Sequence, residues 1–262
     1  MTAPRLPFDR PSADRRRILV LGGTTEGYAL AEALVAADRW DPVSSLAGRT
    51  ATPRPPAGTL RVGGFGGPEG LARYLTAEGI AAVIDATHPF ASRMGWNAAT
   101  ACAATGVPLL RLERPRWVPG DGDAWTLVPD WEAAVTALRT LGARRVLLAI
   151  GRQEVAPFAG LEAVWMLIRS VQAPDPMPPF AQAEVLLARG PFTQEDEAAL
   201  LRDRRIDTIV CKNSGGVTDA KLAAARSLGV RVVMRDRPTR PDTATAATVA
   251  EALAWVARSE TA

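Results

Sequence analysis

The chain has 262 residues, of which 47% are hydrophobic and 23% charged, a balance typical of a soluble globular protein with its own core. The formal net charge is +3, and the arginines are not interleaved with aromatic residues in one patch, which argues against nucleic-acid binding. No apolar stretch approaches the roughly 18 residues that a membrane span requires.

Residues 1–16 are polar and proline-rich and lack the apolar core of a secretory signal, so we interpret them as a mobile leader. After them, short apolar runs alternate with alanine-rich segments whose apolar residues recur at helical spacing. In the first half the expected strands, with the turns that follow them, lie at 17–23, 42–48, 59–67, 80–89 and 107–115, and the expected helices at 25–38, 68–79 and 91–106.

The segment at 113–125 is rich in Pro, Gly and Asp, which predicts a domain boundary between 17–116 and 117–262. Beyond it the expected strands lie at 143–151, 162–171, 183–190, 206–216 and 230–238, and the expected helices at 131–142, 193–205, 217–229 and 243–258. Because the strands are continuously apolar, we expect an α/β fold whose parallel sheets are covered by helices on both faces.

The two cysteines, Cys102 and Cys211, lie far apart in apolar segments. This arrangement predicts two buried core thiols and excludes a disulfide framework or a zinc cluster. We therefore expect no metal site and a reducing, cytoplasmic location.

The first strand ends in GGTTEG, which resembles a dinucleotide-binding fingerprint with threonine in place of the middle glycine. Gly22 would permit the tight turn and Gly27 close packing of helix on strand. Amides at the start of the helix would attract a phosphate. The cofactor-binding residues expected here are Gly22, Gly23, Thr24, Thr25 and Glu26.

The second strand ends in VSSLAGRT and has no acidic residue where NAD-binding sites usually place one. Arg49 and the hydroxyls of this segment would instead bind a 2′-phosphate, which favours NADP(H). The cofactor-binding residues expected here are Ser45, Ala47, Gly48 and Arg49. The alternative is that Arg49 is a solvated loop residue.

Two further turns would complete this edge of the sheet. The third strand runs into Gly63, Gly64, Phe65 and Gly66, where backbone can approach a flat ligand closely. The fourth ends in DATHPFA, with Asp85, Thr87 and His88, the single histidine of the chain. Since ligands of open parallel sheets bind at the carboxyl ends of the strands, these turns should line one crevice.

The stretches ILVLGGTTEG, DATHPFA, LRLERPRW and KNSGG, in this order, resemble the precorrin-6A reductase family of cobalamin (vitamin B12) biosynthesis. The resemblance implies NADPH-dependent reduction of the tetrapyrrole precorrin-6A to precorrin-6B by hydride transfer to the macrocycle. It also implies two Rossmann-like halves, the first binding NADP, with the active site in the cleft between them.

A polycarboxylate tetrapyrrole needs basic partners, and arginine suits carboxylates. The expected substrate-binding residues lie near predicted strand ends: Arg111, Arg114, Arg152, Arg169, Lys212, Asn213, Ser214, Gly215 and Gly216. The last four would open a helix and hold either cofactor phosphate or substrate carboxylate.

The reduction also needs a proton, for which Asp85 and His88 are the candidate catalytic residues. For His88 three roles stay open: binding or positioning, proton donation, and a structural turn. Two other functions also stay open, a nucleotide-sugar glycosyltransferase and a non-catalytic NADP- or tetrapyrrole-binding protein. The expected partner is a small molecule rather than nucleic acid or a membrane; the sequence sets no oligomeric state, and a monomer is the working expectation.

Overall fold

The computed structural model describes residues 15–48, 54–217 and 219–259. Two compact units are present: one contains the chain up to Arg114 and again from Thr239 onward, and the other is Pro115–Pro238. Residues 1–14, most of the segment interpreted as a leader, and Arg49 lie outside the described residues. Arg16 already belongs to the first strand.

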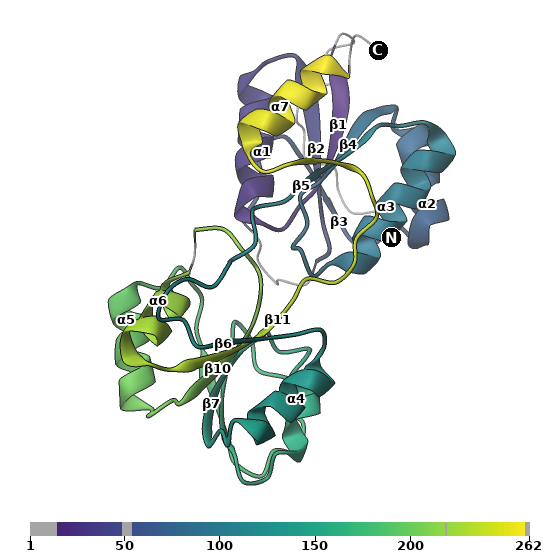
Figure 1. The fold of residues 1–262 in the computed structure, drawn as a ribbon. Helices are drawn as coiled ribbons and strands as arrows, with labels where there is room; N and C mark the ends of the chain where they lie inside the picture. Colours follow the sequence, from purple (N-terminus) through teal and green to yellow (C-terminus); the bar gives the residue numbers. More distant parts are fainter. Residues whose placement is uncertain (1–14, 49–53, 218, 260–262) are drawn as a thin grey trace. The chain divides into compact units, whose positions relative to one another are not determined.

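The first unit contains a six-stranded sheet in the order β12-β5-β4-β1-β2-β3, with every neighbouring pair parallel. Its strands are β1 (Arg16–Leu21), β2 (Trp40–Leu46), β3 (Thr59–Val62), β4 (Ile80–Asp85), β5 (Leu109–Leu112) and β12 (Ala244–Ala246). Its helices are α1 (Thr25–Ala36), α2 (Gly67–Ala77), α3 (Ser92–Thr105) and α7 (Val249–Arg258). Helices α1 and α7 cover one face and α2 and α3 the other, as Figure 1 shows.

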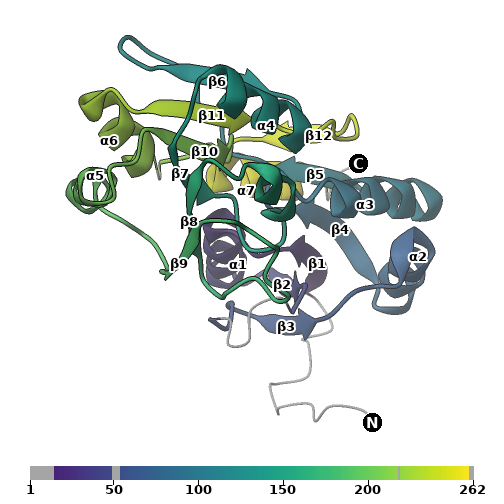
Figure 2. The same ribbon diagram turned by 90° about the horizontal axis from the view of Figure 1, so that it is seen from below.

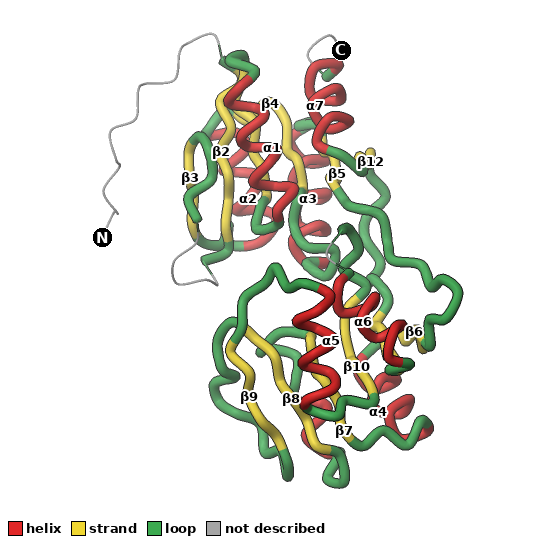
Figure 3. Tube along the Cα trace, turned by 90° about the vertical axis from the view of Figure 1, so that its left-hand side faces the viewer, coloured by secondary structure: helices red, strands yellow, loops and turns green. Residues whose placement is uncertain are grey.

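The second unit repeats this plan with the strand order β6-β11-β10-β7-β8-β9, again all parallel. Its strands are β6 (Trp125–Val128), β7 (Arg145–Ala149), β8 (Trp165–Ser170), β9 (Ala183–Leu187), β10 (Thr208–Lys212) and β11 (Arg231–Arg235). Its helices are α4 (Trp131–Thr140), the 3-10 helix η1 (Ala156–Gly160), α5 (Gln194–Asp203) and α6 (Ala220–Leu228). Figures 2 and 3 show α5 and α6 side by side on one face; α4 packs with η1 on the other.

The apolar runs become central strands because both of their faces are buried. Leu19 of β1 faces the core under α2 and α3, whereas Ile18 and Val20 face the core under α1 and α7. All three are at most 1% exposed. The expectation of parallel sheets covered on both faces is therefore confirmed.

The end of the chain corrects the expected domain assignment and the helix at 243–258. Ala244–Ala246 is the strand β12, which pairs with β5 of the first sheet, and Thr248 caps α7. Residues from Thr239 therefore belong to the first unit, not to a domain at 117–262. The physical reason is that β12 satisfies the open edge of β5 while α7 buries its apolar face beside α1.

A second short strand went unpredicted at the start of the second unit. Trp125–Val128 forms β6, which pairs with β11 at the edge of that sheet. The chain enters the second unit at Pro115 and returns to the first at Thr239. In each case the first strand after the change of unit, β6 or β12, becomes an edge strand of the sheet. Within the described ranges, no helix has the length and apolar character needed to cross a membrane.

Both cysteines are buried, as expected, and neither is in a disulfide. Burial raises the pKa of the Cys102 thiol to about 12, with a smaller contribution from Asp85, and that of Cys211 to about 11. Thiolate is the reactive form, so the folded protein should react with a disulfide reagent such as DTNB far more slowly than a free thiol at mildly alkaline pH. Both thiols should react promptly in denaturant; prompt labelling of the native protein would contradict this placement.

Candidate functional site

The first sheet has its topological switch point between β1 and β4. From β1 the chain continues to β2 and β3 on one side, then crosses back to β4 on the other side. The turns that leave β1 and β4 are joined, because Ala86 N donates to Leu21 O at 2.9 Å and Thr24 Oγ1 donates to Ala86 O at 2.7 Å. Switch points of this kind are where open α/β sheets bind ligands.

Thr24 and Gly27 shape the turn after β1. Thr24 caps α1, and its Oγ1 also accepts from Gly27 N at 3.2 Å. A Cβ on Gly27 would lie 3.3 Å from Gly22 Cα and 3.4 Å from Ala86 Cβ, so close packing does favour glycine there. Gly23 has φ +114° and open space around it, which leaves backbone accessible beside the exposed Thr25.

Glu26 and Arg114, expected on cofactor and substrate respectively, are brought together. Arg114 Nη1 lies 3.1 Å from Glu26 Oε2 and 3.2 Å from Oε1. Glu26 lies in the first turn of α1, Arg114 lies two residues after β5, and both side chains are partly buried. Arg114 thus holds the N-terminus of α1 to the segment that follows β5.

Arg61, at the end of β3, is a site residue that sequence reasoning missed. Its guanidinium donates to Gly63 O at 2.6 Å and Gly64 O at 2.8 Å, stacks 3.7 Å from the Phe65 ring centroid, and reaches Ser45 Oγ at 3.4 Å. Burial lowers its pKa, with an opposing contribution from Tyr74. Its place two residues before Gly63 and the glycine turn was the signal available in the sequence.

The turns after β2 and β3 lie side by side. Gly63 N donates to Leu46 O at 2.9 Å, and Gly22 N donates to Ser45 O at 3.0 Å, so the turns after β1, β2 and β3 form one continuous edge. Gly48, which follows Ala47, has φ +72°, and a Cβ there would lie 3.1 Å from Val62 Cγ1. Gly66 has φ +82° and precedes α2.

Asp85, a candidate proton donor, is buried and fully engaged. Oδ1 accepts from Thr87 N at 3.1 Å and from Thr87 Oγ1 at 2.6 Å, and Oδ2 accepts from Arg240 Nη2. Asp85 is 3% exposed. Both carboxyl oxygens are occupied by donors within the fold, so these contacts favour a role in positioning the turn.

His88 lies in the same turn and is partly exposed. Its Nδ1 accepts from Phe90 N at 3.2 Å. A ring nitrogen that accepts a hydrogen bond carries no proton, so the neutral imidazole has its proton on Nε2. His88 can therefore act as a hydrogen-bond donor through Nε2.

Two of the arginines expected on substrate are instead built into the fold. Arg169 of β8 pairs with Glu197 of α5 at 2.9 Å, and the two side chains are only 8% and 3% exposed. Arg111 of β5 donates to Pro241 O at 2.8 Å and pairs with Glu113 at 3.4 Å. Both guanidiniums already have partners within the fold, which favours structural roles over the expected contacts with a ligand.

The KNSGG stretch also differs from expectation, because α6 begins at Ala220 and these residues do not open it. Asn213 is 2% exposed, and its side-chain amide exchanges two hydrogen bonds with the backbone of Trp117, at 2.9 and 3.0 Å. Gly216 N donates to Pro115 O at 3.2 Å, and the carbonyl of Ser214 accepts from Arg237. A Cβ on the buried Gly215 would lie 2.1 Å from Pro115 O.

Lys212 ends β10 and lies in a charged cluster around Glu154, another residue that sequence reasoning missed. Lys212 Nζ is 2.8 Å from Glu154 Oε1, and Arg235 Nη1 is 3.3 Å from Oε2, which also accepts from Trp131 Nε1 at 2.6 Å. The cluster lies at the carboxyl ends of the adjacent strands β11, β10 and β7. The switch point of the second sheet lies between β10 and β7.

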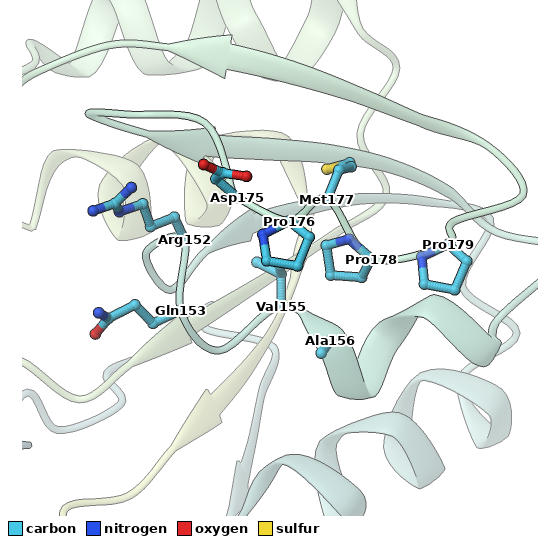
Figure 4. Close-up of a pocket in the computed structure, with 9 residues that line it drawn as sticks. All are labelled: Arg152, Gln153, Val155, Ala156, Asp175, Pro176, Met177, Pro178 and Pro179. Carbon is cyan, nitrogen blue, oxygen red and sulfur yellow. The ribbon is translucent and has the colours of Figure 1, made fainter.

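Arg152 lies beside that switch point, in the loop after β7. Residues at 152–156 and 175–179 line a pocket of about 650 Å³ that is open to solvent on one side. Figure 4 shows Arg152 and Asp175 at one end of it and the prolines extending away from them. Five basic residues were expected to bind substrate. Of these, Arg152 alone has no hydrogen bond or ion pair with the described residues.

Comparison with known proteins covers nearly the whole chain. The sequence model of the family described as Precorrin-6x reductase CbiJ/CobK matches residues 17–257. A precorrin-6A reductase from Rhodococcus erythropolis is 51% identical over 243 residues, 92% of this chain and 97% of the relative. A precorrin-6A reductase from a Sinorhizobium species is 50% identical over 251 residues, 95% of this chain and 96% of the relative.

A solved structure described as CobK precorrin-6A reductase superposes with a TM-score of 0.87 at 47% sequence identity, covering 93% of this chain and 97% of that one. The chain therefore belongs to the Precorrin-6x reductase CbiJ/CobK family.

Proposed function

We propose that this chain reduces precorrin-6A to precorrin-6B in cobalamin biosynthesis, with NADPH as the hydride donor. Membership of the family makes the chain a reductase, and the coenzyme and the roles of individual residues are what we add. The observation that carries the proposal is the pairing of the turns after β1 and β4 at the switch point, through Thr24 and Ala86.

The residues at this edge fit a dinucleotide. Gly23 leaves a space that a Cβ would occupy. Thr24 caps the amide of Gly27, whereas the amides of Thr25 and Glu26, in the first turn of α1, have no partners within the helix. An anion beside Thr25 would therefore gain both hydrogen bonds and the favourable end of the helix dipole. When bound, NADPH supplies the hydride.

The corner formed by β2 and β3 fits a 2′-phosphate. No carboxylate follows β2, whereas Ser45, Arg61 and, outside the described residues, Arg49 supply hydroxyl and guanidinium groups. Arg61 also fixes Gly63 and Gly64, so one side chain would both shape the turn and attract the phosphate.

His88 would lie next to the reacting end of the coenzyme, because its turn adjoins the one that receives the phosphates. Its Nε2–H can orient a ligand or supply a proton. Asp85 and Thr87 hold the turn that carries it. In the second unit, Arg152 and the pocket beside it would bind a carboxylate of the tetrapyrrole.

The proposal is tested by titrating the purified protein with NADPH and then adding precorrin-6A while absorbance at the nicotinamide band is recorded. We expect saturable binding followed by loss of NADPH absorbance. Absence of NADPH binding would overturn the proposal. Binding without turnover would identify a carrier or sensor.

The choice of coenzyme gives a sharper prediction. Arg49→Glu should weaken NADPH binding by roughly 10- to 100-fold, since a charge-assisted hydrogen bond contributes about 1.5–3 kcal/mol, and should change NADH binding little. The matched control is Arg54→Glu, because Arg54 pairs with Glu32 of α1 instead. Equal losses for both coenzymes would show that Arg49 has no role at the 2′-phosphate.

A further inference from the structure

Arg240 reaches the turn after β4 from the segment that precedes β12. Its side chain is 6% exposed. The guanidinium donates to Asp85 Oδ2, and its Nη1 lies 3.4 Å from His88 O and 3.2 Å from Pro89 O. One side chain therefore holds the last residue of β4 and two successive carbonyls of the histidine turn. A planar fork with five donors can do this, whereas a lysine ammonium cannot match the geometry.

The surroundings of Arg240 are shaped to hold this guanidinium. A Cβ on Gly95 of α3 would lie 2.7 Å from both Nε and Nη2, so the glycine leaves the space that the guanidinium occupies. The neighbouring residues are anchored as well: Ser92 Oγ donates to Thr239 O at 3.1 Å and Arg111 to Pro241 O at 2.8 Å. Three successive residues, 239–241, are thus fastened to the first unit.

The contacts of His88 depend on the backbone that Arg240 holds. The His88 carbonyl also accepts from Ala91 N at 2.7 Å, and the ring Nδ1 accepts from Phe90 N. The orientation of the imidazole is therefore set by the path of residues 88–91. We propose that Arg240 is a positioning residue that, through the carbonyls of His88 and Pro89, keeps the imidazole in the tautomer with its proton on Nε2.

The tautomer can be measured directly, because His88 is the single histidine of the chain. Untagged protein grown with ring-¹⁵N histidine should show one unprotonated and one protonated ring nitrogen in mildly alkaline solution, where histidine is neutral. In Arg240→Lys the two nitrogen shifts should move toward each other, as they do when both tautomers are populated. The control is Arg17→Lys. Arg17 lies near the amino end of β1, at the opposite end of the strands from His88, and pairs there with Asp41 and Glu78.

Turnover supplies the second measurement, and only this part rests on the proposed function. Arg240→Lys should lower kcat about tenfold with little change in the Kd for NADPH, because a misplaced group loses catalytic alignment rather than coenzyme contacts. In a His88→Ala background the same substitution should change kcat less than about twofold, since the positioned group is absent.

Unchanged nitrogen shifts in folded Arg240→Lys would overturn the proposal, as would an equal loss of kcat in both backgrounds. If Arg240→Lys does not fold, Gly95→Ala displaces the same guanidinium and is put through the same two measurements. If wild-type protein does not oxidise NADPH with precorrin-6A, the proposed function fails while the nitrogen spectrum still tests Arg240.

Discussion

Replacing Glu197 with alanine should lower the free energy of unfolding by about 3–5 kcal/mol, the usual cost of leaving one partner of a buried ion pair without the other. Arg169 and Glu197 are almost completely buried and 2.9 Å apart, and Phe192 covers the guanidinium with its ring centroid 4.4 Å away. Without Glu197 the positive charge would stay in the core of the second unit. Urea unfolding followed by tryptophan fluorescence measures the change.

Two controls separate this effect from a general effect on α5. Glu195→Ala removes an exposed carboxylate from the same helical turn and should cost less than about 1 kcal/mol. The double substitution Arg169→Met with Glu197→Leu should regain much of the loss, because an apolar pair needs no desolvation. If this double variant also keeps its KM for precorrin-6A, Arg169 is structural; a loss below about 1 kcal/mol in Glu197→Ala would contradict the buried pair.

Gly215→Ala should destabilise the protein by at least about 3 kcal/mol, because it combines backbone strain with a collision. Gly215 has φ +69°, and a Cβ there would lie 2.1 Å from Pro115 O and 2.3 Å from Arg237 Nη2. Those groups fasten the start of the second unit to the end of β10. The change is measured by urea unfolding.

Gly229→Ala isolates the contribution of strain. Gly229 ends α6 with φ +65°, and a Cβ there would meet nothing within 4 Å. Its replacement should cost only about 1 kcal/mol, the penalty of the left-handed conformation. Equal losses at the two positions would mean that contact with Pro115 does not decide the role of Gly215.

The local composition was enough to predict the central strands and the edge of the first sheet that carries the candidate site. Runs such as ILVL are apolar at every position, which indicates a strand buried on both faces, and glycines or threonine follow them where turns and caps require those residues. The alternation with helices then predicts that the carboxyl ends of these strands meet at one edge.

The sequence could not reveal the partners of isolated polar residues. Arg111, Arg169 and Asn213 look like the residues proposed to bind ligands, because a charged or amide side chain at a strand end has the same local pattern in either role. Only the tertiary contacts with Pro241, Glu197 and Trp117 favour structural roles for them. Arg61 and Arg240 were not predicted as site residues, because their local sequence does not reveal what they contact. Their roles come from contacts with the glycine turn and the histidine turn.

Two parallel sheets covered by helices, the glycine and histidine turns at the strand ends, and the lack of a carboxylate after β2 could all be predicted from the sequence, because each depends on residues close together in the chain. The pairing of β12 with the first sheet and the contact of Arg240 with the His88 carbonyl arise only when distant segments of the chain pack together. Ala244–Ala246 is too short and too weak in strand propensity to signal a strand, and it becomes one because the free edge of β5 supplies its hydrogen-bond partners.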